Sequence, residues 1–118
     1  MGKKWEIVYW ESTRGDKPVK DFIENQEEQV QVKIVRATEY LQEFGTLVGS
    51  PHVKKLTGTE LWELRVLGAA NIRIFYLAVD KRKFLFLHAF KKKTQKTEKK
   101  EIKLALERLV KYRKIVIS

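Results

Sequence analysis

The stretch that decides the fold is LWELRVLGAANIRIFYLAVDKRKFLFLHAF, residues 61–90, which contains three runs of aliphatic, aromatic and β-branched residues. The runs cover residues 61–67, 71–79 and 83–90, and only GAA (68–70) and DKR (80–82) separate them. This composition is typical of strands, and such short connections allow only antiparallel neighbours. The sequence therefore predicts a three-stranded meander. The middle run is apolar on both faces, so we expect it to lie between the other two with cover on each side.

The segment before the meander predicts one more strand and two helices. WEIVYW (5–10) is short and rich in aromatic and β-branched residues, as strands are. In residues 12–26 a turn through Gly15 precedes a short helix, with Asp16 as its cap and Pro18 near its first position. A longer amphipathic helix follows, because its apolar residues are spaced four, three, four and three apart and Gly45 is placed to end it. These apolar residues are Val30, Ile34, Ala37, Leu41 and Phe44.

A polar connection (46–60) leads into the meander, and a final helix follows it. Thr97 can cap this helix, and one apolar stripe runs along it. The stripe consists of Ile102, Ala105, Leu106, Leu109 and Val110. The predicted class is α+β: a small antiparallel β-sheet with two N-terminal helices and one C-terminal helix, in the order β-α-α-β-β-β-α. The tail KIVIS (114–118) could add a short strand or pack against the sheet.

Length and composition favour one globular domain, residues 1–118, with 43% hydrophobic residues. No apolar run approaches the roughly 20 residues of a membrane helix, and MGKKWEIVYW lacks the features of a signal peptide. We therefore expect a cytoplasmic protein with no membrane partner. The chain has no cysteine and only two histidines, so we expect no metal site and no cofactor.

The positive charge is concentrated in the C-terminal third. The net charge is +10, and residues 81–114 hold fourteen basic and three acidic residues, which gives +11. The rest of the chain holds eleven basic and twelve acidic residues, which gives −1. This asymmetry is typical of a face that binds a polyanion. A lysine-rich helix that is merely soluble has the same charge, so charge alone leaves both interpretations open.

Two arginines interrupt the apolar strands, Arg65 and Arg73. A guanidinium inside a sheet requires an anionic partner or access to the rim. The partner could be Glu63 or Glu60, or the phosphate of a substrate, which suits the planar fork of donors. Pairing of residue 67 with 73, or of 68 with 72, would place both arginines on one face. A slip by one residue would separate them, and the sequence does not decide the register.

The third run ends in a cationic segment, KKKTQKTEKK (91–100), with six lysines in ten positions. Lys91, Lys92 and Lys93 leave the strand at the end where its neighbours carry the two arginines. We expect Lys92 to share the face of Phe90, His88 and Phe86, and Lys91 and Lys93 to take the other. A nearby polyanion would relieve the repulsion among these lysines, and a lysine beside other cations can act as a general acid or base.

Two other residues of the strands have open interpretations. His88 has no acidic residue close in sequence, so it is either a core or rim histidine or a carrier of protons. Tyr76 is either part of the core or a ring that reaches the open face near Arg65 and stacks on a base. His52, in a loop after Pro51, is a weaker candidate still.

The chain resembles the RelE/HigB superfamily of bacterial toxins, in particular its phage-derived HigB-like branch. The resemblance lies in the segments LWELRV, NIRIFYLAV and LHAFKKKTQKTEKKEI, the last leading into ALERL. The resemblance covers nearly the whole chain, and HAFKKKTQKT is its most specific part. It implies a RelE-like fold and a toxin of a type II toxin–antitoxin pair that cuts mRNA on the ribosome without a metal. It also implies a partner, a small helix-turn-helix antitoxin (HigA-like) that covers the site.

The resemblance further implies roles for individual residues. Arg65 matches an arginine that stabilises the attacked phosphate, and Lys92 matches a basic residue with a similar role after the last strand. Arg73 corresponds to a strand arginine found in many members. Lys54 and Lys55 lie in the loop whose lysines bind the transcript or ribosomal RNA. Some members have a catalytic tyrosine near the start of the final helix, where this chain reads Gln95-Lys96-Thr97, so Lys96 would substitute for it or the role is absent.

These observations combine in one hypothesis, a metal-independent mRNA endoribonuclease. A ribose 2′-hydroxyl would attack the adjacent phosphate, Arg65, Arg73 and Lys92 would neutralise the developing charge, and Lys93, Lys96 or His88 would move protons. Contacts with RNA would come from Lys54, Lys55, Lys91 and Tyr76. The alternatives are a non-catalytic RNA- or ribosome-binding protein, a gyrase-directed toxin of the same superfamily, and an inactive remnant.

Overall fold

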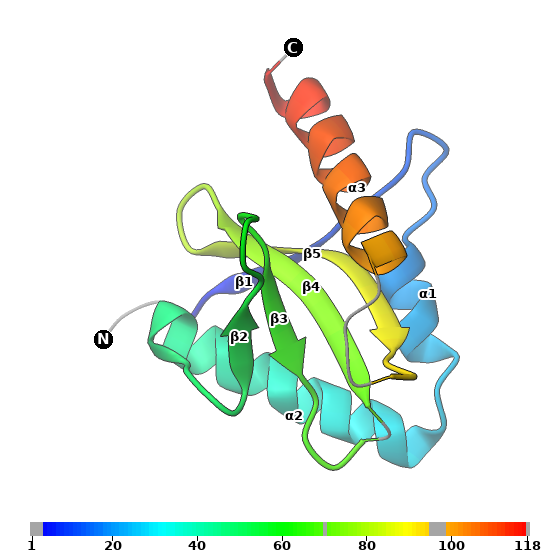
Figure 1. The fold of residues 1–118 in the computed structure, drawn as a ribbon, viewed down its shortest axis with the longest axis vertical. Coiled ribbons are helices and arrows are strands. Elements are labelled where there is room, and N and C mark those ends of the chain that lie inside the picture. The colour runs from blue at the N-terminus through cyan, green and yellow to red at the C-terminus, as the bar shows by residue number, and fades with distance from the viewer. Residues whose placement is uncertain (1–3, 70, 95–98, 118) are drawn as a thin grey trace.

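The computed structural model describes residues 4–69, 71–94 and 99–117, and its centre is a five-stranded sheet (Figure 1). The strand order is β1-β5-β4-β3-β2. The strands are β1 (Glu6–Tyr9), β2 (Val53–Lys55), β3 (Trp62–Arg65), β4 (Ile72–Val79) and β5 (Lys83–Lys91). The helices are α1 (Pro18–Glu24), α2 (Glu28–Phe44) and α3 (Lys99–Ile117), with a short 3-10 turn η1 (Gly45–Leu47) after α2. The predicted α+β class is therefore confirmed.

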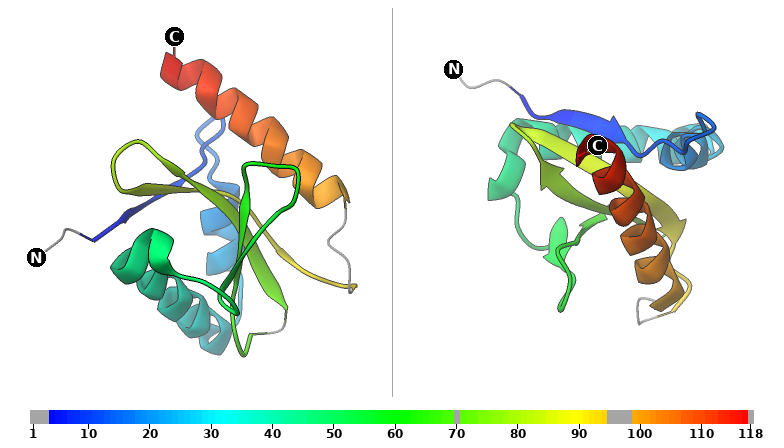
Figure 2. Two further views of the ribbon diagram at one scale, coloured as in Figure 1. Left: turned by 60° about the vertical axis from the view of Figure 1, so that its left-hand side comes forward. Right: turned by 90° about the horizontal axis from the view of Figure 1, so that it is seen from above.

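The helices cover both faces of the sheet. α1 and α2 pack on one face, where Val19, Ile34 and Leu41 join a cluster of buried residues from β3, β4 and β5. α3 packs on the opposite face through Ala105 and Leu109 (Figure 2). β4 lies in the middle of the sheet with both faces covered, as its apolar sequence predicts. Every helix in the described part of the chain is too short or too polar to cross a bilayer.

The predicted meander is confirmed, but the sheet has two features that the sequence did not reveal. Both β3 and β5 are antiparallel to β4. β2 lies in the segment expected to be a polar connection, and it pairs with β3 because Val53 fills the core while its two lysines stay exposed. β1 pairs in parallel with β5 at the other edge. The order is therefore β-α-α-β-β-β-β-α, and the sheet is mixed rather than purely antiparallel.

The helix boundaries agree with the sequence in part. Gly45 ends α2 as predicted, with a φ of 57° that favours glycine. α1 begins at Pro18 with Lys17 as the N-cap, so the assignment of Asp16 was wrong. Asp16 instead belongs to the preceding turn, where its backbone N–H donates to the Ser12 hydroxyl. α3 continues to Ile117, so the tail that the sequence left unassigned is part of this helix. The expected cap Thr97 lies outside the described residues.

An irregularity in the β4–β5 ladder changes which side chains share a face. Phe75 pairs with His88, but the next residue, Tyr76, pairs with Phe86, so Leu87 is an extra residue in β5. As a result His88 and Phe90 lie on the α3 face, whereas Phe86 packs in the cluster under α1 and α2. The expectation that Phe86 shares the face of His88 was therefore wrong.

Candidate functional site

Arg65 and Arg73 lie directly opposite each other on neighbouring strands. β3 and β4 pair Leu64 with Ile74 and Arg65 with Arg73. This register differs by two residues from the pairings considered in the sequence, and an even shift keeps the same faces together. Both arginines are therefore on the α3 face of the sheet. The two arginines meet because of the pairing register of β3 with β4, which their residue types do not determine.

A buried carboxylate holds the two arginines. Glu63 is only 1% exposed, and its Oε1 accepts a hydrogen bond of 3.3 Å from Arg65 Nε. Arg73 Nε lies 3.7 Å from the same oxygen. A carboxylate this buried requires paired charges, and two opposed arginines would repel each other without it. The predicted ion pair with Glu63 is confirmed, whereas the other candidate partner, Glu60, pairs with Arg113 on the surface.

The arginines keep part of their surface free for a ligand. The Arg65 side chain is 29% exposed and that of Arg73 is 16% exposed. Arg73 also donates through Nη1 to the Ile72 carbonyl at 3.1 Å, and its Nε has no hydrogen-bond partner in the described part of the chain. The pair is thus fixed at the inner end by Glu63 and can offer its outer donors to an anion.

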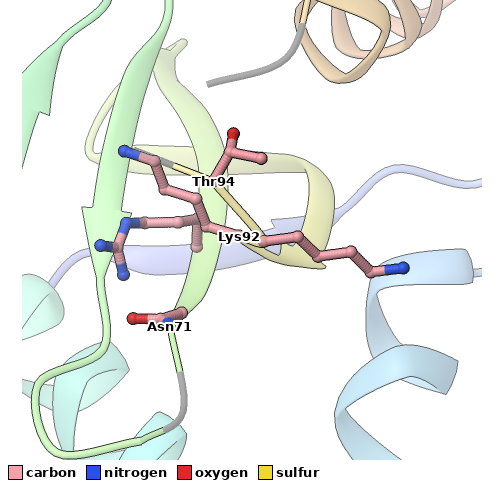
Figure 3. Close-up of a pocket in the computed structure, with 5 residues that line it drawn as sticks. Asn71, Lys92 and Thr94 are labelled. Atoms are coloured by element: carbon pink, nitrogen blue, oxygen red, sulfur yellow. The ribbon is translucent and has the colours of Figure 1, made fainter. Parts of the chain in front are cut away.

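An open pocket of about 350 Å³ lies beside Arg73 at the end of the sheet. Its lining residues are Asn71, Arg73, Lys92, Lys93 and Thr94. In Figure 3 the labelled Lys92 lies between Asn71 and Thr94. The backbone N–H of Lys92 donates to the Asn71 carbonyl at 2.8 Å, which fixes the segment after β5 against the start of β4. Three cations and no acidic group among the described lining residues make this pocket attractive to a phosphate.

The other predicted lysines that the structure describes lie at different places on the sheet. Lys91 and Lys93 border a neighbouring pocket of about 290 Å³ together with His88, and Lys93 lines both pockets. Lys54 pairs with Glu63 across β2 and β3, so it shares the face of the two arginines. Lys55 lies on the opposite face, with its Nζ 6.0 Å from the Trp62 ring centroid. Lys96 lies outside the described residues.

His88 joins β5 to the start of α3. Its Nε2 lies 3.2 Å from Glu101 Oε1, and its ring stacks on Phe90 with centroids 5.2 Å apart. The side chain is 12% exposed, and this burial lowers the pKa of His88 despite the opposing effect of Glu101. Arg108, which donates to the Leu87 carbonyl at 2.7 Å, adds to the lowering by its charge. His88 does not line the pocket of Arg73, and its role in proton transfer stays a prediction.

Tyr76 does not reach the open face. It is 4% exposed and packs edge-on against Phe84, with ring centroids 5.3 Å apart, in the core under α2. Burial raises the pKa of its hydroxyl. It stands three residues after Arg73 in one strand, and an odd spacing places two side chains on opposite faces. Of the two interpretations left open by the sequence, Tyr76 is therefore part of the core and not a ring on the open face near Arg65.

The structure adds residues that the sequence analysis missed. Asn71 lines the pocket of Arg73 from a backbone conformation with φ of 58°, which asparagine adopts readily in turns. A second pocket of about 350 Å³ lies between α2 and the end of β3. It is lined by Lys33, Arg36, Ala37, Tyr40, His52, Arg65 and Leu67. The helical spacing of Lys33, Arg36 and Tyr40 was the available signal, and it was overlooked because the apolar stripe beside it decided the helix.

Residues 21–110 match the family model of the phage-derived Gp49-like proteins (DUF891). The chain belongs to this family. Gp49-like proteins are a RelE/HigB-like toxin family, associated with the toxins of toxin–antitoxin systems. The resemblance found in the sequence is thus confirmed at the level of the family, while the specific HigB assignment stays a prediction. A search of curated proteins gave no match.

The part of the chain that matches the Gp49-like family contains the candidate site. It extends from α1 into α3 and includes the arginine pair, Glu63 and both basic pockets. The match omits β1, whose parallel pairing with β5 builds the far edge of the sheet. The site of this Gp49-like protein is therefore built by the segment that defines the family.

Proposed function

We propose that this Gp49-like protein is a toxin that cuts mRNA on the ribosome, as an endoribonuclease that needs no metal ion. The observation that carries the proposal is the arginine pair on a rigid sheet, with Lys92 and Lys93 around the pocket beside Arg73. Fixed cations at a phosphate stabilise the charge that develops during cleavage of a phosphodiester. The family association with toxins supports the biological role.

The proposed reaction is an internal transfer at phosphorus. The ribose 2′-oxygen forms a bond to the adjacent phosphorus, the bond from phosphorus to the 5′-oxygen breaks, and the products are a 2′,3′-cyclic phosphate and a free 5′-hydroxyl. One proton leaves the 2′-hydroxyl and one is delivered to the departing 5′-oxygen. Negative charge grows on the phosphoryl oxygens, where Arg65, Arg73 and Lys92 donate hydrogen bonds.

The groups that would move protons are less well defined in this site than the cations that would stabilise the charge. Among the described residues, Lys93 is the best placed, because it lines both the pocket of Arg73 and the neighbouring pocket of His88. Lys96 remains a candidate from the sequence. A site without a strong base depends on accurate positioning of the 2′-hydroxyl, and we propose that the ribosome supplies this alignment. In this proposal, cleavage depends on the ribosome because the ribosome aligns the 2′-hydroxyl for a site that lacks a strong base.

The proposed partners follow from the charge of the same surface. Lys54, on the face of the arginines, and Lys91, at the end of β5, would contact the transcript or ribosomal RNA through phosphates. A small helix-turn-helix antitoxin (HigA-like) would silence the toxin by covering this surface. Lys55 lies on the other face of β2, and we assign it to ribosomal RNA rather than to the attacked strand.

The test is translation of a defined mRNA in a purified bacterial system, with the new 5′ ends mapped by primer extension. Wild-type protein is expected to cut only when ribosomes are present. Arg65→Ala is expected to lose about 100-fold or more of the cleavage rate, whereas Arg14→Ala, an exposed arginine in the turn before α1, is expected to cut normally. A folded Arg65→Ala protein with full activity would overturn the role of Arg65.

A second candidate function is RNA or ribosome binding without cleavage, and Glu63 favours it. The carboxylate already neutralises part of the charge of both arginines, which leaves less of it to stabilise the charge that grows during cleavage and suits a docking surface. This candidate predicts binding that weakens with salt and no new 5′ ends. If neither cleavage nor RNA binding is found, the gyrase-directed alternative becomes the next to test.

A further inference from the structure

The second pocket, between α2 and the end of β3, has the chemistry of a nucleotide site. α2 supplies one side through Lys33, Arg36 and Tyr40, which are spaced three and four residues apart and so lie along one stripe of the helix. His52 and Arg65 supply the other side. The pocket thus combines three cations with two rings that can stack.

The two cations that α2 supplies to the pocket keep their charge available. The Lys33 ammonium donates to the carbonyl of Gly68 in the β3–β4 hairpin, so the helix and the hairpin are tied together. Arg36 is exposed and makes no ion pair or hydrogen bond with its side chain to any residue that the structure describes. Within the described ranges, neither Lys33 nor Arg36 has an acidic partner that would cancel its attraction for a phosphate.

The aromatic side of the pocket is open to a base. The rings of Tyr40 and His52 are in contact, with centroids 4.6 Å apart, and Tyr40 is 40% exposed. Phe44, one helical turn further along, supports Tyr40 with a centroid distance of 4.9 Å. An exposed ring backed by other rings is a platform for stacking, which every base can use.

Arg65 connects this pocket to the first one. It lines the second pocket and shares Glu63 with Arg73, which lines the first. The backbone N–H of Arg65 donates to the His52 carbonyl at 2.7 Å, so the backbones that carry the ring and the arginine are tied together. A single strand that places one phosphate at the arginine pair therefore has the basic first pocket on the Arg73 side and the basic, aromatic second pocket on the Arg65 side.

We propose that the second pocket binds a nucleotide of single-stranded RNA next to the attacked phosphate. Its base stacks on Tyr40 and His52, and its phosphate contacts Lys33, Arg36 and Arg65. This inference rests on the RNA substrate proposed above and adds a subsite that positions the strand. Such a subsite explains how a sheet with little acid–base chemistry of its own can align one particular phosphate.

The stacking part is tested with a short single-stranded RNA whose ribose 2′-oxygens are methylated, which prevents cleavage, and with binding followed by fluorescence anisotropy. Tyr40→Ala is expected to weaken binding about 5-fold or more, and Tyr40→Phe to bind like wild type, because the ring is what stacks. A duplex DNA of equal length is expected to bind less tightly, since its bases are hidden. Equal affinity of Tyr40→Ala and wild type would overturn the stacking role.

The charge part uses the double variant Lys33→Glu/Arg36→Glu and, as a matched control, Lys20→Glu/Lys111→Glu, which changes two exposed lysines on α1 and α3. The first is expected to lose affinity and to lower the salt-dependence slope by about 0.7, since the two side chains contact the same phosphate and each phosphate contact to a single strand contributes roughly 0.7. Identical affinities and slopes for the two double variants would overturn the proposal.

The subsite and the nuclease can fail separately. If wild-type protein binds the methylated RNA with this pattern of variants but cuts no mRNA, the subsite stands and the nuclease does not. If wild-type protein cuts mRNA on the ribosome and all the α2 variants bind RNA and cut like the control, the nuclease stands and the subsite does not.

Discussion

The substitution Glu63→Gln isolates the role of the buried carboxylate. Glutamine keeps the shape of the side chain and removes its charge beneath Arg65 and Arg73. Arg65 Nε then donates to a neutral amide instead of a carboxylate, and losing the ion pair of this partly exposed arginine costs about 1 kcal/mol. Two arginines opposite each other on neighbouring strands then repel, which costs about 1 kcal/mol more.

The expected loss is therefore about 2 kcal/mol in the free energy of unfolding, from those two contributions. For a chain of 118 residues this corresponds to a fall in Tm of roughly 8 °C. The assay is urea unfolding at neutral pH followed by circular dichroism. Glu107→Gln, on the exposed side of α3, is the matched control and is expected to stay within about 0.5 kcal/mol of wild type.

The same experiment has a second arm that separates charge from shape. Arg73→Met added to Glu63→Gln removes the repulsion and is expected to recover about 1 kcal/mol of the loss. If Glu63→Gln is as stable as Glu107→Gln, the carboxylate does not hold the arginine pair in place.

Two further predictions concern the core and the start of α3. Gly45→Ala is expected to lower the free energy of unfolding by about 2 kcal/mol, because its φ is 57° and a Cβ there would meet the Trp5 indole. Gly49→Ala, whose Cβ would have open space, is its control in thermal unfolding, and equal losses would contradict the packing argument. Burial lowers the pKa of His88, so the unfolded chain binds a proton more readily and this residue's contribution to stability falls as the pH drops below about 6.5. Between about pH 7.5 and about pH 5.5, the free energy of unfolding in urea is expected to fall less for His88→Gln than for wild type. Equal falls would argue against a buried neutral His88.

Most of the secondary structure could be predicted because its signals are local. The spacing of apolar residues defines α2, and the short connections after Leu67 and Val79 leave only an antiparallel meander. β2 was missed because three residues with two lysines have no strand pattern of their own, and Val53 is buried by the tertiary core that it joins. The parallel pairing of β1 with β5 joins segments more than 70 residues apart, which periodicity does not encode.

The sequence by itself determined the residue types of the site: two arginines in apolar strands, a lysine segment after the last strand, and a resemblance that the Gp49-like family confirms. Only the tertiary structure decided how these groups meet. The β3–β4 register set Arg65 against Arg73, the extra residue in β5 turned Phe86 away from His88, and packing of α3 brought Glu101 to His88. Strand side chains alternate with a period of two, so a shift of one residue reverses every face, and that choice depends on the energy of the whole core rather than on any local pattern.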